Sequence, residues 1–324
     1  MSEPLLRVTG LRKTYAVRGS KDIVHAVDGV SFDLGKGETL GIVGESGCGK
    51  STVARLLVRL EDPTAGSIEL DGRDLTALRG HAMRAARRRI QLVFQDPQAS
   101  LNPRLTVGRT LSEVLTVHRI CREPGKRDAR VRELLSMVGL PPEFAGRYPH
   151  QMSGGQRQRV GIARALAVEP EILVLDEPIS ALDVSVRSEV VNLLTRLRAE
   201  LGLSYVFIAH DLGMVRHVSD RIAVMYLGRI VEVGPWKPVS DDPLHPYTRA
   251  LQDAVPVPDP EVEERRQVSP LVGEVPDPAN PPQGCNFHPR CPVAQQLCVD
   301  ADPQLEELAP AHRAACHAAA GRLG

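Results

Sequence analysis

The stretch LGIVGESGCGKST, residues 40–52, decides the fold class of this 324-residue chain. A short apolar run, Leu40–Val43, leads into a glycine-rich loop that ends in Lys50 and Ser51. Such a loop turns backbone N–H groups inward around a phosphate, and the start of the following helix adds a partial positive charge. Lys50 can then reach the β- and γ-phosphates, and Ser51 can bind Mg²⁺. The alternative is a glycine-rich turn with a chance lysine, but only six lysines are present and one has the required position.

A second apolar run, Ile172-Leu-Val-Leu, ends in the two acids Asp176 and Glu177. The run suits a strand that is buried on both faces, and open α/β sheets bind ligands at the carboxyl ends of such strands. Asp176 would hold Mg²⁺ through water, and Glu177 would orient or deprotonate an attacking water. Two solvated acids at a strand end are the alternative, which the presence of the phosphate loop in the same chain disfavours.

A third motif, Ser153-Gly-Gly-Gln156, precedes a helical segment. A serine and two glycines at a helix start form a second anion-binding end, although a plain helix cap would use the same residues. The two phosphate-binding ends lie about 100 residues apart, and one nucleotide held by one chain needs only one of them.

Residues 153–233 alternate between helical and extended patterns, which predicts parallel βαβ units in a doubly wound sheet. Residues 106–140 carry helical periodicity instead. The elements expected after residue 153 are a helix at 156–168, a strand at 172–175, a helix at 185–201, a strand at 205–209, a helix at 211–217 and a strand at 222–226.

The overall composition is that of a soluble globular protein. Forty basic and forty acidic residues give no net charge, and aromatic residues make up 3%, so nucleic acid is not an expected partner. The arginine run at positions 84 and 87–89 could touch nucleic acid or anionic lipid, but we favour a solvated helix face. No stretch approaches the roughly 20 apolar residues of a membrane span. The first residues lack a signal-peptide pattern, which predicts a cytosolic protein.

Together these motifs resemble the ATP-binding subunit of ABC transporters over residues 5–235. Gly44–Ser51 looks like the Walker A loop, Ile172–Glu177 like the Walker B strand with its catalytic glutamate, and Ser153–Gln156 like the family signature. The resemblance also implies a Q-loop at Gln95, a D-loop ending at Asp183, a switch histidine at His210 and an adenine-stacking aromatic at Tyr15. The implied ATP site comprises Tyr15, Gly44, Glu45, Ser46, Gly47, Cys48, Gly49, Lys50, Ser51, Thr52, Gln95, Ser153, Gly154, Gly155, Gln156, Asp176 and Asp183, with Ser51, Gln95 and Asp176 around Mg²⁺ and Glu177 and His210 as catalytic residues.

The segments 148–159, 177–186, 245–251 and 284–292 are similar to the ATPases of oligopeptide and dipeptide importers, and nickel importers share much of this pattern. The resemblance implies a second ATPase subunit (identical or paralogous), two transmembrane permease subunits and an extracytoplasmic substrate-binding protein. It places the chain at the cytoplasmic face of the inner membrane. A soluble ABC ATPase of repair or translation is the alternative. Repair members carry a long coiled coil between the Walker A and signature motifs, for which the roughly 100 residues here leave no room, and translation members usually carry two cassettes where this chain has one. A regulator that merely binds ATP is disfavoured by the intact Glu177 and His210.

The expected fold is α/β: a P-loop NTPase of ABC type, with a RecA-like core, an antiparallel β edge and a helical subdomain at about 98–165. We expect the nucleotide-binding domain to span 1–255. Eight prolines fall between residues 256 and 282, which predicts an extended linker, and a small cysteine-bearing module would complete 256–324.

Four of the six cysteines, Cys285, Cys291, Cys298 and Cys316, crowd into this module with the spacing C-x₅-C-x₆-C-x₁₇-C. In a reducing compartment such a cluster predicts a metal centre. Four thiolates suit Zn²⁺ and a [4Fe–4S] cluster equally, and the neighbouring histidines would favour zinc if one replaced a cysteine. The resemblance to peptide-importer ATPases implies the iron–sulfur cluster. We expect it to be structural, because the linker should separate it from every nucleotide motif.

Overall fold

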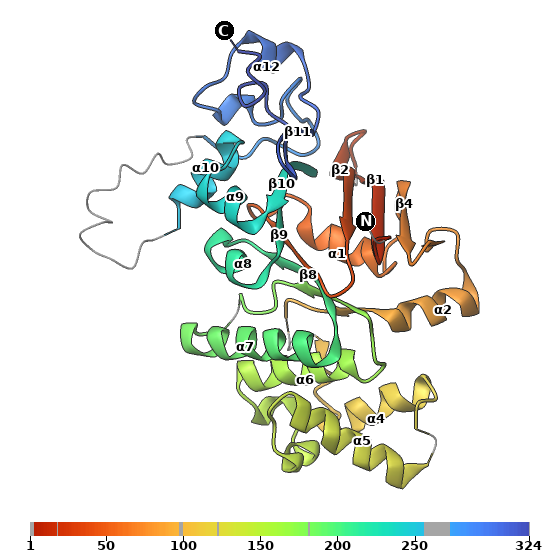
Figure 1. Cartoon of the computed structure of the whole chain (residues 1–324). Coiled ribbons are helices and arrows are strands. Elements are labelled where there is room, and N and C mark those ends of the chain that lie inside the picture. The colour runs from red at the N-terminus through yellow and green to blue at the C-terminus, as the bar shows by residue number, and fades with distance from the viewer. Residues whose placement is uncertain are drawn as a thin grey trace, which may run out of the picture.

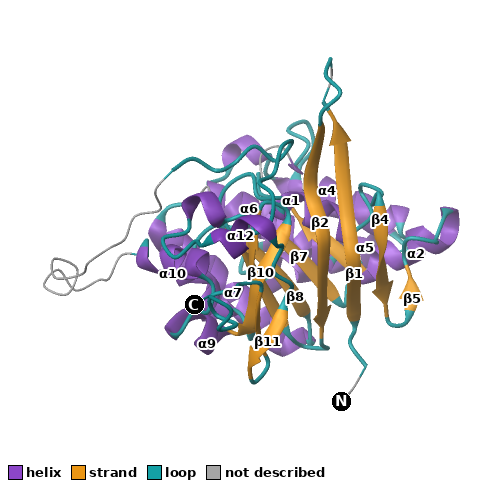
Figure 2. Ribbon diagram, turned by 90° about the horizontal axis from the view of Figure 1, so that it is seen from above, coloured by secondary structure: helices purple, strands orange, loops and turns teal. Residues whose placement is uncertain are grey.

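The chain folds around an eight-stranded sheet with a four-stranded sheet beside it (Figures 1 and 2). The computed structural model describes residues 3–17, 19–96, 100–121, 123–180, 182–255 and 273–323. The order of the large sheet is β11-β12-β10-β9-β3-β8-β7-β6. Its strands are β3 (Thr39–Val43), β6 (Ile90–Val93), β7 (Ile172–Asp176), β8 (Ser204–Ala209), β9 (Arg221–Tyr226), β10 (Arg229–Pro235), β11 (Glu306–Ala309) and β12 (His312–Ala314).

The strands from β9 to β6 are parallel to one another. Parallel neighbours need long crossovers, which here contain helices. The alternation predicted for residues 153–233 is present, with bounds that differ by at most two residues. Its helices are α6 (Gly154–Leu166), α7 (Val184–Leu201) and α8 (Leu212–Val218), and helix α1 (Lys50–Leu57) follows β3.

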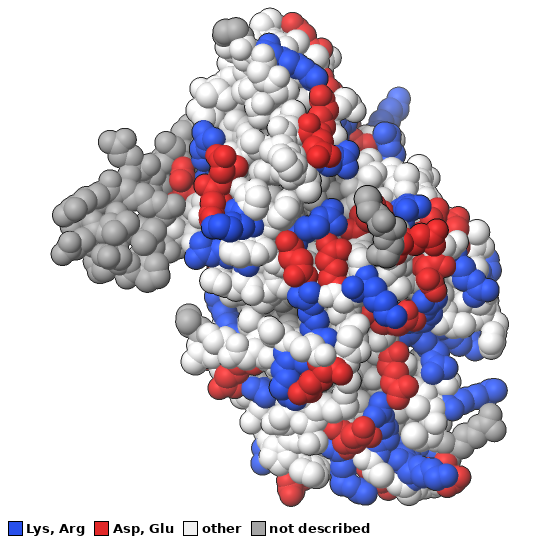
Figure 3. Space-filling view, viewed as in Figure 1, with Lys and Arg blue, Asp and Glu red and all other residues white. Residues whose placement is uncertain are grey.

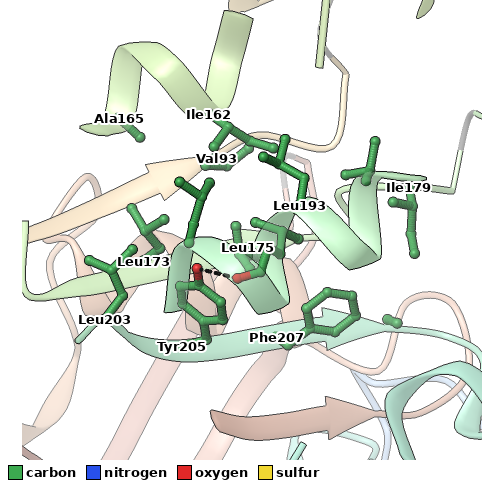
Figure 4. Close-up of a cluster of buried hydrophobic side chains, with 14 of the residues drawn as sticks. Val93, Ile162, Ala165, Leu173, Leu175, Ile179, Leu193, Leu203, Tyr205 and Phe207 are labelled. Atoms are coloured by element: carbon green, nitrogen blue, oxygen red, sulfur yellow. Dashed lines mark hydrogen bonds between the residues drawn. The ribbon is translucent and has the colours of Figure 1, made fainter. Parts of the chain in front are cut away.

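The parallel strands are buried on both faces, as continuous apolar runs require. In β7, Leu173 and Leu175 belong to the core on one face, whereas Ile172 and Val174 belong to the core on the other. Figure 4 shows the first of these cores, where Leu173 and Leu175 lie close to the ring of Tyr205. The Tyr205 hydroxyl donates a hydrogen bond of 2.9 Å to the carbonyl of Leu194 in α7. This bond satisfies the one polar atom of a ring that is otherwise packed among apolar side chains.

The smaller sheet is antiparallel and has the order β2-β1-β4-β5. It is the antiparallel edge predicted beside the parallel core. The core between α1, this sheet and the large sheet includes Leu6, Leu34 and Val53. Its strands are β1 (Leu6–Ala16), β2 (Ile23–Leu34), β4 (Ala65–Leu70) and β5 (Arg73–Asp74).

A helical region lies at the far side of α6 and α7 from the small sheet (Figure 1). Its first helices, α4 (Val107–Val117) and α5 (Pro124–Met137), pack on α6 through Leu111, Leu134 and Val160. Two short 3₁₀ turns, Pro142–Gly146 and Pro149–Gln151, connect α5 to α6. These elements fall within the segment predicted as a helical subdomain, although the division into domains stays a prediction.

The C-terminal segment (residues 273–323) packs on the large sheet, and this corrects one expectation. Strand β12 pairs with β10 and β11 pairs with β12, so the segment adds two strands to the sheet edge. Phe287 is 1% exposed and its ring lies edge-on to Tyr226 of β9, at 5.2 Å between ring centroids. The predicted separation from the nucleotide motifs is therefore wrong, because the segment uses the core of the cassette instead of building its own. Most of the predicted linker lies outside the described residues.

The remaining described helices are α2 (Gly80–Arg89), α9 (Trp236–Asp241), α10 (Pro246–Asp253) and α12 (Gln296–Asp300), with a 3₁₀ turn at His288–Arg290. No helix in the described ranges is both long and apolar enough to cross a membrane. Basic and acidic side chains are interspersed over the face in Figure 3. In α2, Arg89 pairs with Glu171 and Asp71, and Arg87 donates to backbone carbonyls, so half of the arginine run has a structural role.

Candidate functional site

The glycine-rich loop joins the carboxyl end of β3 to α1, as its sequence predicts. Two of its glycines are required by close backbone contacts. A Cβ atom at Gly44 would lie 2.1 Å from the carbonyl oxygen of Met225. Gly49 caps α1 with φ = 105°, and a Cβ there would lie 2.0 Å from the carbonyl oxygen of Ala26. Any side chain at either position would displace the loop, so the sequence pattern reflects steric demands of this fold.

Lys50 extends back over the loop. Its Nζ donates hydrogen bonds of 2.7 Å to the Gly44 carbonyl and 2.9 Å to the Glu45 carbonyl, and the residue is 4% exposed. An ammonium group has three donors, and the third faces only a weak acceptor, the Cys48 Sγ at 3.9 Å, so it is available to an incoming phosphate oxygen. The hydrogen-bond partners of this buried charge are two carbonyls and a thiol, which favours the binding of an anion here.

The first acid of β7 lies beside the end of the loop. The Ser51 hydroxyl donates to Asp176 Oδ1 at 3.0 Å, so the two predicted Mg²⁺ ligands are in contact. Burial raises the pKa of Asp176, and the hydrogen bond from Ser51 acts in the opposite direction. A hydroxyl and a carboxylate are the oxygen ligands that Mg²⁺ prefers.

Glu177 follows at the carboxyl end of β7 in a left-handed backbone conformation, with φ = 43°. Such a conformation is uncommon for a residue with a side chain and is found most often at functional sites. Its Oε2 accepts a hydrogen bond of 2.9 Å from Gln95 Nε2 and lies 3.6 Å from His210 Nδ1. Three motifs that are far apart in the sequence therefore meet at one carboxylate.

These groups line one open cavity of about 470 Å³. The volume is within the range of small-molecule sites. Three lining residues, Val24, Ala26 and Pro278, were not predicted, and Pro278 belongs to the C-terminal segment. The predicted residues that line the cavity are Ser46, Gly47, Gly49, Lys50, Ser51, Thr52, Gln95, Glu177 and His210.

Tyr15 lies at the edge of this region and does not line the cavity. Its hydroxyl donates to Glu61, and Lys13 Nζ lies 5.1 Å from the ring centroid. Its neighbour in the sheet, Val24 of β2, does line the cavity. The role of Tyr15 as an adenine platform stays a prediction.

The third motif lies away from the cavity. Ser153 caps α6 in a reciprocal arrangement: its Oγ accepts from the Gln156 N–H at 3.3 Å, and Gln156 Oε1 accepts from the Ser153 N–H at 3.0 Å. A Cβ at Gly155 would lie 2.3 Å from Val186 of α7, so this helix start packs closely on α7. Asp183 is exposed at the N-cap of α7. None of the predicted residues Ser153, Gly154, Gly155, Gln156 and Asp183 lines the cavity of its own chain.

The four C-terminal cysteines all line a second, small cavity of about 10 Å³. Burial raises the pKa of the Cys285 thiol to about 11 and also raises the pKa values of Cys291 and Cys316, while backbone N–H hydrogen bonds act in the opposite direction. Within the described ranges, no three or more His, Cys, Asp or Glu side chains are arranged as a ligand group for a metal ion. The metal centre therefore stays a proposal.

The sequence matches two families along its length. Residues 27–180 match the ABC transporter family, and residues 231–298 match the C-terminal region of oligopeptide/dipeptide transporters. The putative oligopeptide transport ATP-binding protein YkfD of Bacillus subtilis is 53% identical over 314 residues, covering 97% of this chain and 95% of its own. The chain belongs to the ABC transporter ATP-binding proteins. The oligopeptide transport ATP-binding protein AppF of the same species is 51% identical, with 97% of both chains covered.

Solved ABC structures confirm the cassette fold. The dimeric, post-hydrolysis structure of the ATP-binding cassette MJ0796 with ADP and phosphate is 32% identical, with a TM-score of 0.65, and covers 71% of this chain and 98% of its own. The cbiO1 subunit of the Clostridium perfringens transporter complex cbiONQ is 29% identical, with a TM-score of 0.64, over 74% of this chain and 92% of its own. The predicted ABC fold is thus confirmed, whereas the cysteine-bearing module is not.

One polar cluster behind the loop was not predicted from the sequence. The Glu45 N–H donates to the Tyr247 hydroxyl at 2.8 Å, and the Glu45 carboxylate accepts two hydrogen bonds from Arg290. Arg290 precedes Cys291 in the C-terminal segment and lies 245 residues after Glu45. The only sequence signal for it was the likeness of segment 284–292 to peptide-importer tails, which carries no information about a contact with the loop.

Proposed function

We propose that the chain is the ATP-hydrolysing subunit of an importer for di- and oligopeptides. The observation that carries this proposal is the joint match: the cassette matches the ABC transporter family, and the C-terminal region matches oligopeptide/dipeptide transporters. Relatives that cover nearly the whole chain are named as oligopeptide transport ATP-binding proteins. Nickel or another small solute is the alternative cargo, and the names of these relatives favour peptides.

In the proposed reaction, the loop amides and Lys50 bind the β- and γ-phosphates of ATP. Ser51, Asp176 and Gln95 would hold Mg²⁺, which neutralises charge on the phosphates. Glu177 would orient the attacking water and accept its proton, because it lies at the cavity surface next to the Mg²⁺ ligands. His210, 3.6 Å from Glu177, would hold the other side of the γ-phosphate. Expulsion of water when the site closes would strengthen each of these interactions.

The site would be completed by a second cassette. Ser153 and its neighbours offer a helix start to an anion but lie outside their own cavity, so they would serve a nucleotide bound to the partner. MJ0796 forms a dimer in its solved structure, which supports this arrangement. In the assembly, two permease subunits would carry the peptide, an extracytoplasmic protein would deliver it, and this chain would lie on the cytoplasmic face of the inner membrane.

Recovery of the complex from its native membrane tests this assignment. A tag on this chain should copurify two permease subunits and a second cassette after solubilisation in mild detergent. A matched strain carrying the tag on an unrelated cytosolic protein controls for adhesion. Recovery of the chain alone from the soluble fraction, or with ribosomes or DNA, would favour a soluble ABC ATPase.

The proposed metal centre would be held by Cys285, Cys291, Cys298 and Cys316. The observation that supports this proposal is that all four thiols line one cavity. The donor set fits a [4Fe–4S] cluster or Zn²⁺, although the side chains must move apart to admit either. Bound there, the group would cross-link the segment and so supply folding energy.

Anaerobic purification should give a brown protein with broad visible absorption and about four irons per chain, as a cubane cluster requires. Replacing Cys291 by Ser should remove most of the iron, whereas Cys121→Ser, at a cysteine remote from this cavity, should leave it in place. A colourless preparation with one zinc per chain would refute the cluster but keep the ligands. A metal-free preparation with four titratable thiols in an ordered segment would refute both.

A further inference from the structure

We propose that Arg290 is a positioning residue for the phosphate loop, and that it acts by holding the carboxylate of Glu45. The inference rests on the proposed nucleotide site and extends it to a residue outside the cassette motifs. It gives the C-terminal segment a part in ATP binding, which the sequence did not predict.

The contact between the two side chains is bidentate. Arg290 Nη1 lies 2.7 Å from Glu45 Oε2, and Arg290 Nη2 lies 3.0 Å from Glu45 Oε1. The Arg290 side chain is 4% exposed and the Glu45 side chain 26%. Two parallel charge-assisted bonds fix orientation as well as distance, and their removal from water sets them apart from exposed ion pairs, which contribute little.

Glu45 is the first residue of the loop after Gly44, and it is fixed at three points. Its N–H donates to the Tyr247 hydroxyl at 2.8 Å, its carboxylate binds Arg290, and its carbonyl accepts from Lys50 at 2.9 Å. The same carbonyl accepts from the Cys48 N–H at 3.3 Å, which closes the turn of the loop. When Lys50 moves toward a phosphate, the Lys50 bond weakens. Tyr247 and Arg290 then hold the start of the loop.

Arg290 is itself held firmly. Its guanidinium lies 5.9 Å from the ring centroid of Tyr226, and Nη1 is 3.5 Å from the Tyr226 hydroxyl. The backbone N–H of Arg290 donates to the Phe287 carbonyl at 3.0 Å, and Phe287 packs edge-on against Tyr226. The side chain therefore projects from a fixed point of the core toward the loop, and it need not be ordered when ATP binds.

The position of Glu45 predicts which kinetic constant will change. Glu45 does not line the nucleotide cavity, and its hydrogen bonds join it to Tyr247, Lys50 and Arg290, whereas Glu177 bonds to Gln95. Loss of Arg290 should loosen the loop that binds phosphate and leave the group that activates water unchanged. We expect Arg290→Met to raise the Kd and KM for ATP about tenfold, the scale of one lost charge-assisted contact, with kcat changed by less than about twofold.

A matched control separates positioning of the loop from docking of the segment. Asp302 of the C-terminal segment forms an ion pair with Arg229 of β10 at 2.5 Å, whereas the Glu45 carboxylate pairs with Arg290. Asp302→Asn weakens docking without touching Glu45 and should leave ATP affinity within about twofold of wild type. Arg290→Lys keeps the charge but loses the planar guanidinium that binds both carboxylate oxygens, so it should give an intermediate Kd.

The decisive experiment measures the Kd for a fluorescent ATP analogue with the full-length chain and the KM for ATP in the assembled importer. Both are measured for the single variants above, for Glu45→Gln and for the double variant Arg290→Met/Glu45→Gln. We expect the double variant to bind no more weakly than Arg290→Met alone, because both changes break one contact. Equal effects of Arg290→Met and Asp302→Asn, or additive effects in the double variant, would overturn the proposal. Should Arg290→Met unfold, the Arg290→Lys and Glu45→Gln values carry the test. Failure of the wild-type chain to bind ATP would instead overturn the nucleotide site itself.

Discussion

Replacing Glu177 by Gln is expected to lower ATP turnover by about 10²- to 10⁴-fold, the range attributed to one general base. The substitution keeps the shape of the side chain and its contact with Gln95 but removes the negative charge that would accept a proton from water. ATP affinity should stay within about twofold of wild type, because the phosphates bind to Lys50 and the loop. The ATP-bound state should consequently persist.

Turnover in the assembled transporter and Kd for the ATP analogue are the two measurements. Glu171→Gln is the matched control, since Glu171 adjoins the opposite end of β7 and pairs with Arg89 at the surface. That control should hydrolyse ATP at the wild-type rate within about twofold. Turnover by Glu177→Gln close to that of the control would exclude Glu177 as the base.

Replacing Ser153 by Arg is expected to abolish hydrolysis while its own chain still binds ATP. Ser153 caps α6 and lies outside its own cavity, so the bulky cation would obstruct only a nucleotide presented by the second cassette. In the Glu177→Gln background, ATP should drive association of the two cassettes, and the added Ser153→Arg change should remove that association. Analytical ultracentrifugation with and without ATP measures it.

Lys50→Met supplies the contrast, because it should remove ATP binding in its own chain. A Ser153→Arg variant that loses ATP binding as completely as Lys50→Met would place both motifs around one nucleotide and contradict the shared site. Mixing the two inactive variants further identifies the partner. In a mixed dimer, one site combines the intact Lys50 of the Ser153→Arg chain with the intact Ser153 of the Lys50→Met chain. Recovered hydrolysis therefore means that two copies of this chain form the dimer.

The parts of the site that could be predicted are those with local chemical signals. Gly44 and Gly49 belong to a short strand–loop–helix pattern that is recognisable in the sequence, although the atoms that exclude a side chain there come from Met225 of β9 and Ala26 of β2. Asp176 and Glu177 follow a run of buried apolar residues. Each pattern fits inside about ten residues, and a parallel sheet brings the carboxyl ends of its strands to one edge. The meeting of Gln95, Glu177 and His210 was expected only because the family resemblance gave their order.

The parts that could not be predicted depend on contacts between remote segments. Strands β11 and β12 are short and partly exposed, and they are strands because β12 pairs with β10 and β11 pairs with β12. The pair of Arg290 and Glu45 joins residues 245 positions apart, and nothing near either residue marks the other. The expectation of an isolated tail was wrong for the same reason: prolines report local chain stiffness but not where the chain returns.

Peptide uptake by the reconstituted importer tests the central claim most directly. The complex purified through this chain is placed in liposomes with ATP on the cassette side and the extracytoplasmic protein with a labelled oligopeptide on the other. We predict uptake that requires ATP hydrolysis, is lost with Glu177→Gln and persists with Glu171→Gln. Uptake of peptide that continues at the wild-type rate with Glu177→Gln, or transport of Ni²⁺ but no peptide, would contradict the account.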